Sequence, residues 1–109
     1  MVWTVQVLDE RVQRELDDLP NDLQARFKYI SKLLVEQGPS QVGLPHVRFV
    51  EEGLWEMRLK AQAGIARSMY AVEVGQLVLV LRVFVKKTEQ TPRKEIEIAL
   101  QRLKEWRIR

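Results

Sequence analysis

The fold is decided by three apolar runs in the middle of the chain: LWEMRLK (Leu54–Lys60), GIARSMY (Gly64–Tyr70) and LVLVLRVFV (Leu77–Val85). Two short gaps that contain glycine, Ala61–Gly64 and Glu73–Gln76, separate these runs. Apolar runs of this length, joined by such gaps, predict consecutive antiparallel strands connected by hairpins.

The three predicted strands differ in the faces that they bury. The first run alternates apolar Trp55, Met57 and Leu59 with three charged residues, which predicts one apolar and one polar face. In the second run, Arg67 falls on the same face as the apolar residues Ile65 and Met69. The third run is apolar on both faces, which indicates a central strand that is covered on both sides.

The remaining strands are predicted on either side of a helical region. Val2–Leu8 alternates in character and predicts a strand whose buried face carries Trp3, Val5 and Val7. Further along the chain, Val47–Val50 is able to extend towards the sheet after a loop that is rich in proline and glycine.

The helical region is predicted to form a hairpin that lies over one face of the sheet. Asp9 is placed to cap a helix that runs to about Asp18. A second helix is predicted over about Asp22–Gln37, with a stripe of leucine, phenylalanine and isoleucine. Gly38 and Pro39 end it, because glycine accepts a left-handed cap and proline cannot continue the helix.

The chain is predicted to end in a third helix. Thr91 is placed to cap it and Pro92 suits its first turn. We expect Trp55 and Trp106 to be core anchors between the sheet and this helix. The resulting order, β-α-α-β-β-β-α, places the chain in the α+β class, with an antiparallel sheet and a single domain over residues 1–109.

Composition excludes several kinds of site. The 109 residues include no cysteine and one histidine, His46, so thiolate zinc sites, a cysteine nucleophile and a pair of catalytic histidines are excluded. We expect no metal and no cofactor. No stretch is long and apolar enough to span a bilayer, and the N-terminal stretch becomes charged too early for a signal peptide. We therefore expect a cytoplasmic protein.

Charge is distributed unevenly along the chain. Residues 1–53 carry six Lys/Arg and nine Asp/Glu, a net charge of −3, whereas residues 54–109 carry twelve and six, a net charge of +6. Such asymmetry favours a nucleic-acid partner, although basic residues that merely solvate a sheet and a helix are an equally good explanation. The predicted strands are able to bring together a cationic cluster of Arg58, Lys60, Arg67, Arg82, Lys86 and Lys87.

These motifs, taken in order, resemble the RelE/ParE toxin superfamily, and most closely its HigB branch of phage-related proteins. The residues that carry the resemblance are Leu54-Trp55-Glu56-Met57-Arg58, Gly64-Ile65-Ala66-Arg67 with Tyr70, and Phe84-Val85-Lys86-Lys87-Thr88 with Thr91-Pro92. The resemblance implies the toxin of a type II toxin–antitoxin system, a ribosome-dependent endoribonuclease that cleaves mRNA. It also implies an antitoxin partner, a helix-turn-helix protein of the HigA type.

The resemblance further implies which residues form the active surface. By position, Arg67 matches the arginine of the family's second hairpin strand, Lys86 and Lys87 match the basic pair after the last strand, and Lys60 matches a basic strand end. We expect these four to be catalytic. We expect RNA contacts from Arg58, Arg82, Arg93 and Lys94. Structural alternatives are a salt bridge of Arg67 with Glu56 or Glu73 and solvent-exposed strand ends for the lysines; His46 is weighed as structural or exposed.

Cleavage of RNA without a metal fits these residue types. The reaction needs a base for the 2′-hydroxyl, cations for the phosphorane and an acid for the 5′-oxygen. A lysine whose pKa is lowered by neighbouring cations can serve as the base, and Arg67 can fork onto two phosphate oxygens. Two other functions remain open on the same fold: a ParE-like inhibitor of DNA gyrase, and a module that binds RNA or an antitoxin without catalysis.

Overall fold

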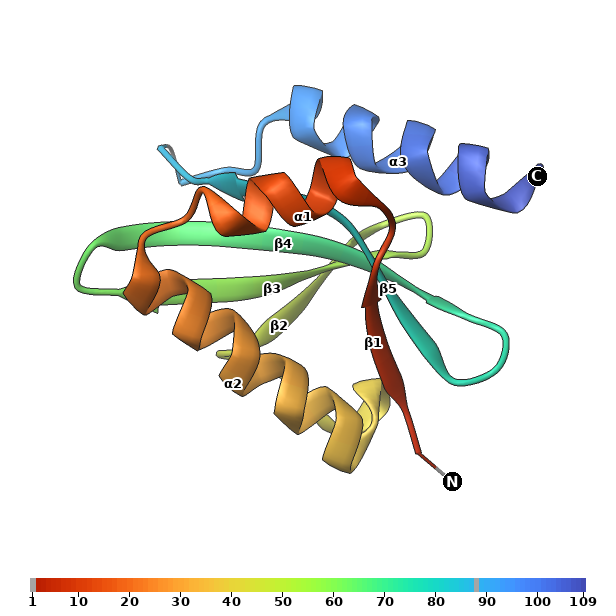
Figure 1. Ribbon diagram of the computed structural model, residues 1–109, viewed down its shortest axis with the longest axis horizontal. Helices are drawn as coiled ribbons and strands as arrows, with labels where there is room; N and C mark the ends of the chain where they lie inside the picture. The colour runs from red at the N-terminus through yellow and green to blue at the C-terminus, as the bar shows by residue number, and fades with distance from the viewer. Residues whose placement is uncertain (1, 88) are drawn as a thin grey trace.

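The computed structural model describes residues 2–87 and 89–109, which form a sheet with helices on both faces (Figure 1). The strands are β1 (Thr4–Val7), β2 (Val47–Glu51), β3 (Leu54–Ala61), β4 (Gly64–Glu73) and β5 (Leu77–Val85). The helices are α1 (Glu10–Asp17), α2 (Asn21–Gln37), the short 3₁₀ helix η1 (Pro39–Gln41) and α3 (Arg93–Arg107). The predicted α+β class is confirmed, and β2 forms where the chain was expected to extend towards the sheet.

The five strands form one mixed sheet in the order β1-β5-β4-β3-β2. β3 pairs antiparallel with β2 and β4, and β4 pairs antiparallel with β5, as the hairpins predict. One strand departs from the expected antiparallel pairing, because β1 runs parallel to β5, from Thr4 opposite Leu77 to Val7 opposite Val80. A parallel pair needs a long connection, and the chain between β1 and β5 contains the helical hairpin and the strands β2, β3 and β4. β5 is therefore a central strand, as its apolar sequence predicts.

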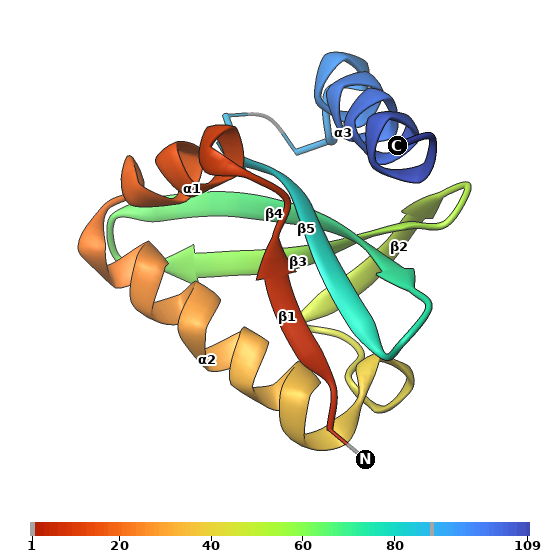
Figure 2. The same ribbon diagram turned by 45° about the vertical axis from the view of Figure 1, so that its right-hand side comes forward.

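The helical hairpin packs on one face of the sheet, and Figure 2 shows α2 lying across the strands. The stripe of α2 is buried, as predicted: Leu23, Phe27, Ile30 and Leu34. It packs against Met57 and Leu59 of β3 and Tyr70 of β4. Trp3, Val5 and Val7 pack against the same cluster, which confirms the face predicted for the first strand.

α3 packs on the opposite face, over β4 and β5. Ile96, Ala99 and Leu103 form a second buried cluster with apolar residues of these strands, and Trp106 packs against it, as predicted. The prediction for Trp55 is wrong, because its ring lies on the hairpin side, 5.2 Å from the ring of Phe49, and remains 37% exposed. The alternation of β3 explains this, since Trp55 shares its face with Met57.

The two predicted helix caps have different outcomes. The Asp9 carboxylate accepts hydrogen bonds from the backbone N–H groups of Arg11 (3.0 Å) and Val12 (3.4 Å), so Asp9 caps α1. At α3, Pro92 occupies the N-cap position without a side-chain hydrogen bond. The Thr91 hydroxyl donates instead to Glu56 of β3, at 2.9 Å. The prediction that Thr91 caps α3 is therefore wrong.

Glu15 of α1 joins both layers through a network of ion pairs. Its Oε2 lies 2.7 Å from Arg82 of β5 and 2.8 Å from Arg102 of α3, and its Oε1 accepts from the Val83 N–H at 3.0 Å. Arg82 also donates to Glu95 of α3 at 2.7 Å. Burial alone raises the pKa of Glu15, but hydrogen bonds from Arg102 and Val83 and the charge of Arg82 outweigh it and lower the pKa.

Replacing Glu15 is expected to destabilise the fold. Glu15→Gln leaves Arg82 and Arg102 without their shared carboxylate, and we expect it to lower the free energy of unfolding by about 3 kcal/mol. A lowered folded-state pKa means that this stabilisation is present above 4.5, the ordinary pKa of the carboxyl, and is lost as the pH falls through the folded value. Urea unfolding from pH 7 to pH 3 measures both effects.

Glu10→Gln is the matched control for this prediction. Glu10 lies on α1 as well, but its side chain is 91% exposed, and its Oε2 lies 3.7 Å from Nη1 of Arg14. Exposed pairs of this kind contribute little, so the Glu10 variant should unfold like the wild type. Equal unfolding curves for Glu15→Gln and the wild type at pH 7 would contradict the role given to the network.

Candidate functional site

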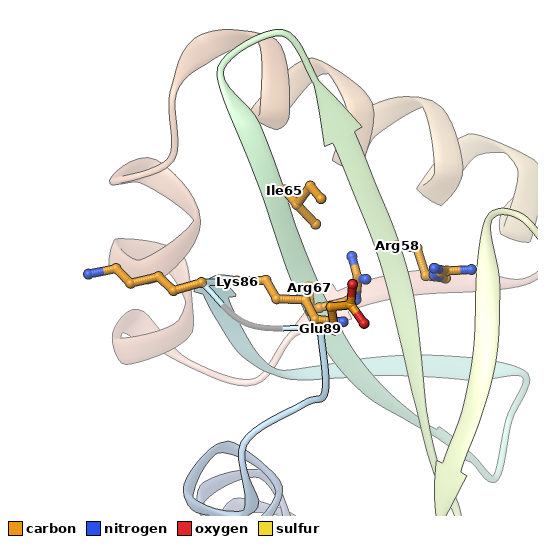
Figure 3. Close-up of a pocket in the computed structure, with 6 residues that line it drawn as sticks. Arg58, Ile65, Arg67, Lys86 and Glu89 are labelled. Carbon is orange, nitrogen blue, oxygen red and sulfur yellow. The ribbon is translucent and has the colours of Figure 1, made fainter.

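A basic groove lies on the α3 side of the sheet, beyond the part of the sheet that α3 covers. It has two halves that share Arg58, Ile65 and Arg67. The lysine half, about 590 Å³ in volume, is completed by Lys86, Lys87 and Glu89. The histidine half, about 350 Å³, is completed by Arg26, Pro45, His46 and Lys60. Figure 3 shows Arg58 on β3 and Ile65 and Arg67 on β4.

Two arginines face each other at the centre of the basic groove. Arg58 of β3 and Arg67 of β4 are direct partners in the antiparallel register, so both side chains emerge from the same face of the sheet. Like charges in this arrangement destabilise a sheet. The Nε of Arg58 is buried and has no hydrogen-bond acceptor among the described residues. An anion bound between the two guanidinium groups would relieve the repulsion and supply that acceptor.

Arg67 is almost fully buried, with 4% of its surface exposed. Its Nε lies 3.2 Å from Oε2 of Glu56, and its Nη1 donates to the Ala66 carbonyl at 3.1 Å. Burial lowers the pKa of Arg67, and the charges of Arg58 and Arg48 lower it further, while Glu56 opposes them. The ion pair with Glu56 that the sequence offered as a structural alternative is present, and Arg67 nevertheless lines both halves of the basic groove.

The lysines expected at the site line the basic groove as well. Lys86 follows β5, and its backbone N–H donates to the Ile65 carbonyl at 2.8 Å, which holds it beside β4. Its side chain is half-buried. Burial lowers the pKa of Lys86, and the neighbouring charge of Arg67 lowers it further. Lys87 and Lys60 are exposed, Lys87 in the lysine half and Lys60 in the histidine half.

The histidine half contains side chains that the sequence did not place at the site. Arg26 of α2 reaches it, with its guanidinium 5.1 Å from the ring centre of Tyr29. The Tyr29 ring in turn meets the His46 ring edge to face at 5.9 Å. No sequence signal marks Arg26, because it sits within an ordinary amphipathic helix. The position of His46 follows from the start of β2 at Val47, opposite Met57 on β3.

Three residues expected to contact RNA lie outside the basic groove. Arg82 does not line it, since its guanidinium is held by Glu15 and Glu95. Arg93, at the start of α3, lies 2.6 Å from Glu51 of β2. Lys94 is exposed on the first turn of the same helix. The structure therefore places none of these three beside Arg67. Thr88, part of the motif after β5, lies outside the described residues.

Two further findings concern metals and membranes. Residues 2–87 and 89–109 contain no group of three or more His, Asp or Glu side chains that could hold a metal ion. Within the same residues, no helix is both long enough and apolar enough to pass through a lipid bilayer.

Comparison with known proteins supplies a family and a fold. A family model described as "Phage derived protein Gp49-like (DUF891)" matches residues 14–104, so the chain belongs to this family. Among solved structures, the archaeal RelE–RelB complex from Pyrococcus horikoshii OT3 contains a chain with a TM-score of 0.57 and 23% identity, covering 78% of this chain and 96% of that one. At this identity the likeness shows the fold, which is RelE-like. No curated protein matches the chain.

Proposed function

We propose that this member of the Gp49-like family is the toxin of a type II toxin–antitoxin pair, and that it cleaves mRNA on the ribosome. The observation that supports this most is the basic groove, where two opposed arginines lie beside a lysine whose pKa is lowered. The RelE-like fold agrees with it, and so does the resemblance of the strand motifs to the HigB branch. Such a protein acts in the cytoplasm, where mRNA and ribosomes are found.

The proposed reaction is attack of the ribose 2′-oxygen on the adjacent phosphorus. Lys86, as the free amine, takes the 2′-hydroxyl proton. The P–O5′ bond breaks as the new P–O2′ bond forms, and the departing 5′-oxygen takes a proton from solvent water, which leaves a 2′,3′-cyclic phosphate and a 5′-hydroxyl. Arg67 and Arg58 stabilise the negative charge of the phosphorane, because they are fixed before the reaction begins. Lys60 and Lys87 hold the neighbouring phosphates.

We also propose a protein partner for the toxin. The solved structure with a similar fold is a complex of RelE with RelB. By analogy this chain has a cognate antitoxin, and the resemblance to the HigB branch points to a small helix-turn-helix protein of the HigA type. A gene for such a protein beside this one, and co-purification of the two products, would support the pairing.

The test of the proposed function is a translation reaction with purified protein, with and without ribosomes. We expect cuts in the mRNA only when ribosomes translate it, with 5′-hydroxyl ends that a kinase labels directly. A gyrase supercoiling assay run on the same preparation separates the ParE-like alternative, which predicts inhibited supercoiling and intact mRNA. Intact mRNA and normal supercoiling, with RNA or antitoxin still bound, would leave the non-catalytic module.

Binding of single-stranded RNA is expected to depend on the groove lysines rather than on α3. Lys60→Gln removes one cation that lines the basic groove, so we expect a several-fold weaker affinity and a slope of log K against log salt smaller by about 0.7. Lys94→Gln removes another exposed charge that lies outside the groove, and it should change neither the affinity nor the slope. Fluorescence anisotropy across a salt series measures both, and equal losses for the two variants would move the RNA-binding surface onto α3.

A further inference from the structure

We propose that Glu56 is the positioning residue of the basic groove: its buried carboxylate orients Arg67 and ties the segment after β5 to the sheet. This inference rests on the proposed function, since it assigns Glu56 a part in the cleavage reaction. Glu56 is fully buried and touches no solvent, so it acts through its neighbours and not on the RNA. The carboxylate is an unusual group to bury in a sheet unless it is paired.

The partners of Glu56 come from three other segments of the fold. Oε2 lies 3.2 Å from Nε of Arg67 on β4 and 3.1 Å from Nη2 of Arg48 on β2. Oε1 accepts a hydrogen bond of 2.9 Å from the hydroxyl of Thr91, just before α3. Glu56 itself is on β3. One carboxylate therefore joins β3 to β4, to the edge strand β2 and to Thr91 at the end of the connection between β5 and α3.

Register and charge explain why Arg67 needs this support. Arg67 faces Arg58 directly across the strand pair, while Glu56 occupies the diagonal position beside it, opposite Met69. Without the carboxylate, repulsion between the two arginines would turn the Arg67 side chain away from its partner. With it, Nε lies against Glu56 and Nη1 donates to the Ala66 carbonyl, and the remaining N–H groups of the guanidinium are left to donate to a phosphate. A displacement of about 1 Å at such a group can lower a rate by about 10²-fold.

Thr91 provides evidence independent of charge. Its sequence context, Thr91-Pro92 before a helix, is typical of a cap, yet α3 begins without a side-chain cap and the hydroxyl binds Glu56 instead. A side-chain cap stabilises the start of a helix, and Thr91 forms its hydrogen bond with the Glu56 carboxylate in place of such a cap. The same bond holds Thr91, five residues after Lys86, against β3, while the Lys86 N–H is held by the Ile65 carbonyl of β4.

The test compares Glu56→Gln and Thr91→Val with a matched carboxylate variant, Glu15→Gln, in the ribosome-containing cleavage reaction. Glutamine preserves the shape of Glu56 and removes its charge; valine removes only the hydrogen bond. We expect kcat to fall by about 10- to 100-fold for Glu56→Gln and by several-fold for Thr91→Val, with KM changed by less than about 3-fold. Glu15→Gln should lower the melting temperature while its folded fraction keeps the wild-type kcat.

Three outcomes would overturn the inference. If Glu56→Gln is folded and retains the wild-type kcat, the carboxylate does not position the site. If the fall in kcat of Glu56→Gln equals its unfolded fraction, as measured by thermal unfolding, the role of Glu56 is structural only. If Glu56→Gln does not fold, Thr91→Val decides, and an unchanged kcat for it rejects the proposal. Absence of cleavage by the wild type in the same reactions is a different failure, since it removes the proposed function and this inference together.

Discussion

The Arg67→Lys protein is expected to fold and to cleave mRNA at least about 10²-fold more slowly than the wild type. Lysine keeps a positive charge near Glu56 but loses the planar fork that contacts two phosphate oxygens at once. The loss should appear in kcat, because the fork is used in the transition state. Single-turnover cleavage of a short mRNA on programmed ribosomes measures it.

Lysine is a better replacement here than alanine, for a structural reason. Alanine would leave Glu56 buried with only Arg48 and Thr91 as partners, and breaking a buried pair can cost about 3–5 kcal/mol. A loss of growth arrest would then be confused with a loss of folded protein. Arg82→Lys is the matched control, because Arg82 also belongs to an ion-pair network but lies outside the basic groove. Comparable losses for Arg67→Lys and Arg82→Lys would contradict the placement of the active site.

The Lys86→Met protein is expected to lose about 10²- to 10⁴-fold in cleavage rate, which is the range for removal of a positioned acid or base. A base acts in its unprotonated form, so a lowered pKa raises the active fraction at neutral pH. The wild-type rate should increase with pH until it passes the pKa of Lys86, which lies below its ordinary value of 10.5. The variant should lose this increase. A pH profile of single-turnover rates measures both effects.

Lys104→Met serves as the control for Lys86, since Lys104 is an exposed lysine of α3 outside the basic groove. It removes the same charge from the chain as a whole and should leave the rate and its pH dependence unchanged. A Lys86 variant that keeps the wild-type profile would assign the base to another group of the groove, and His46 is then the first to replace.

Much of the fold is predictable from local patterns. The alternation of β3, the two-sided apolar sequence of β5 and the stripe of α2 each specify a face, and burial of these faces specifies two layers on one sheet. The parallel pairing of β1 with β5 cannot be predicted from the sequence of β1 itself. It depends on which edge of the sheet remains free for β1, and a short strand with two partly buried residues does not indicate that edge.

The candidate site was predictable only in part. Arg67 and Lys86 come together because β4 and β5 form a hairpin in which Arg67 pairs with Phe84 and Ala66 pairs with Val85, the residue before Lys86. Arg82 is an arginine of β5, and the predicted cluster places it with Arg67 of the neighbouring strand β4. The irregular β4–β5 register between Met69 and Tyr70, together with the nearby helices α1 and α3, places its guanidinium against Glu15 and Glu95 instead. Irregular registers of this kind redirect side chains and cannot be read from alternation alone.

The sequence offers Glu56 as one possible ion-pair partner of Arg67, but it does not indicate that Glu56 is fully buried or that Arg48 and Thr91 also bind it. In LWEMRLK it occupies the polar face of an amphipathic strand, where solvent exposure is the ordinary expectation. It is buried because β2, β4 and the segment before α3 all converge on it, and each brings a polar partner. Such convergence depends on tertiary structure, which is why the sequence context of Thr91 indicates a helix cap and does not indicate the bond with Glu56.

The most direct test of the account is controlled expression of the wild type and Arg67→Lys in growing bacteria, followed by mapping of mRNA 5′ ends. We predict growth arrest with new 5′ ends inside translated reading frames for the wild type, and neither effect for Arg67→Lys at equal protein levels. Growth arrest by the wild type with intact transcripts would contradict mRNA cleavage and would direct attention to DNA gyrase.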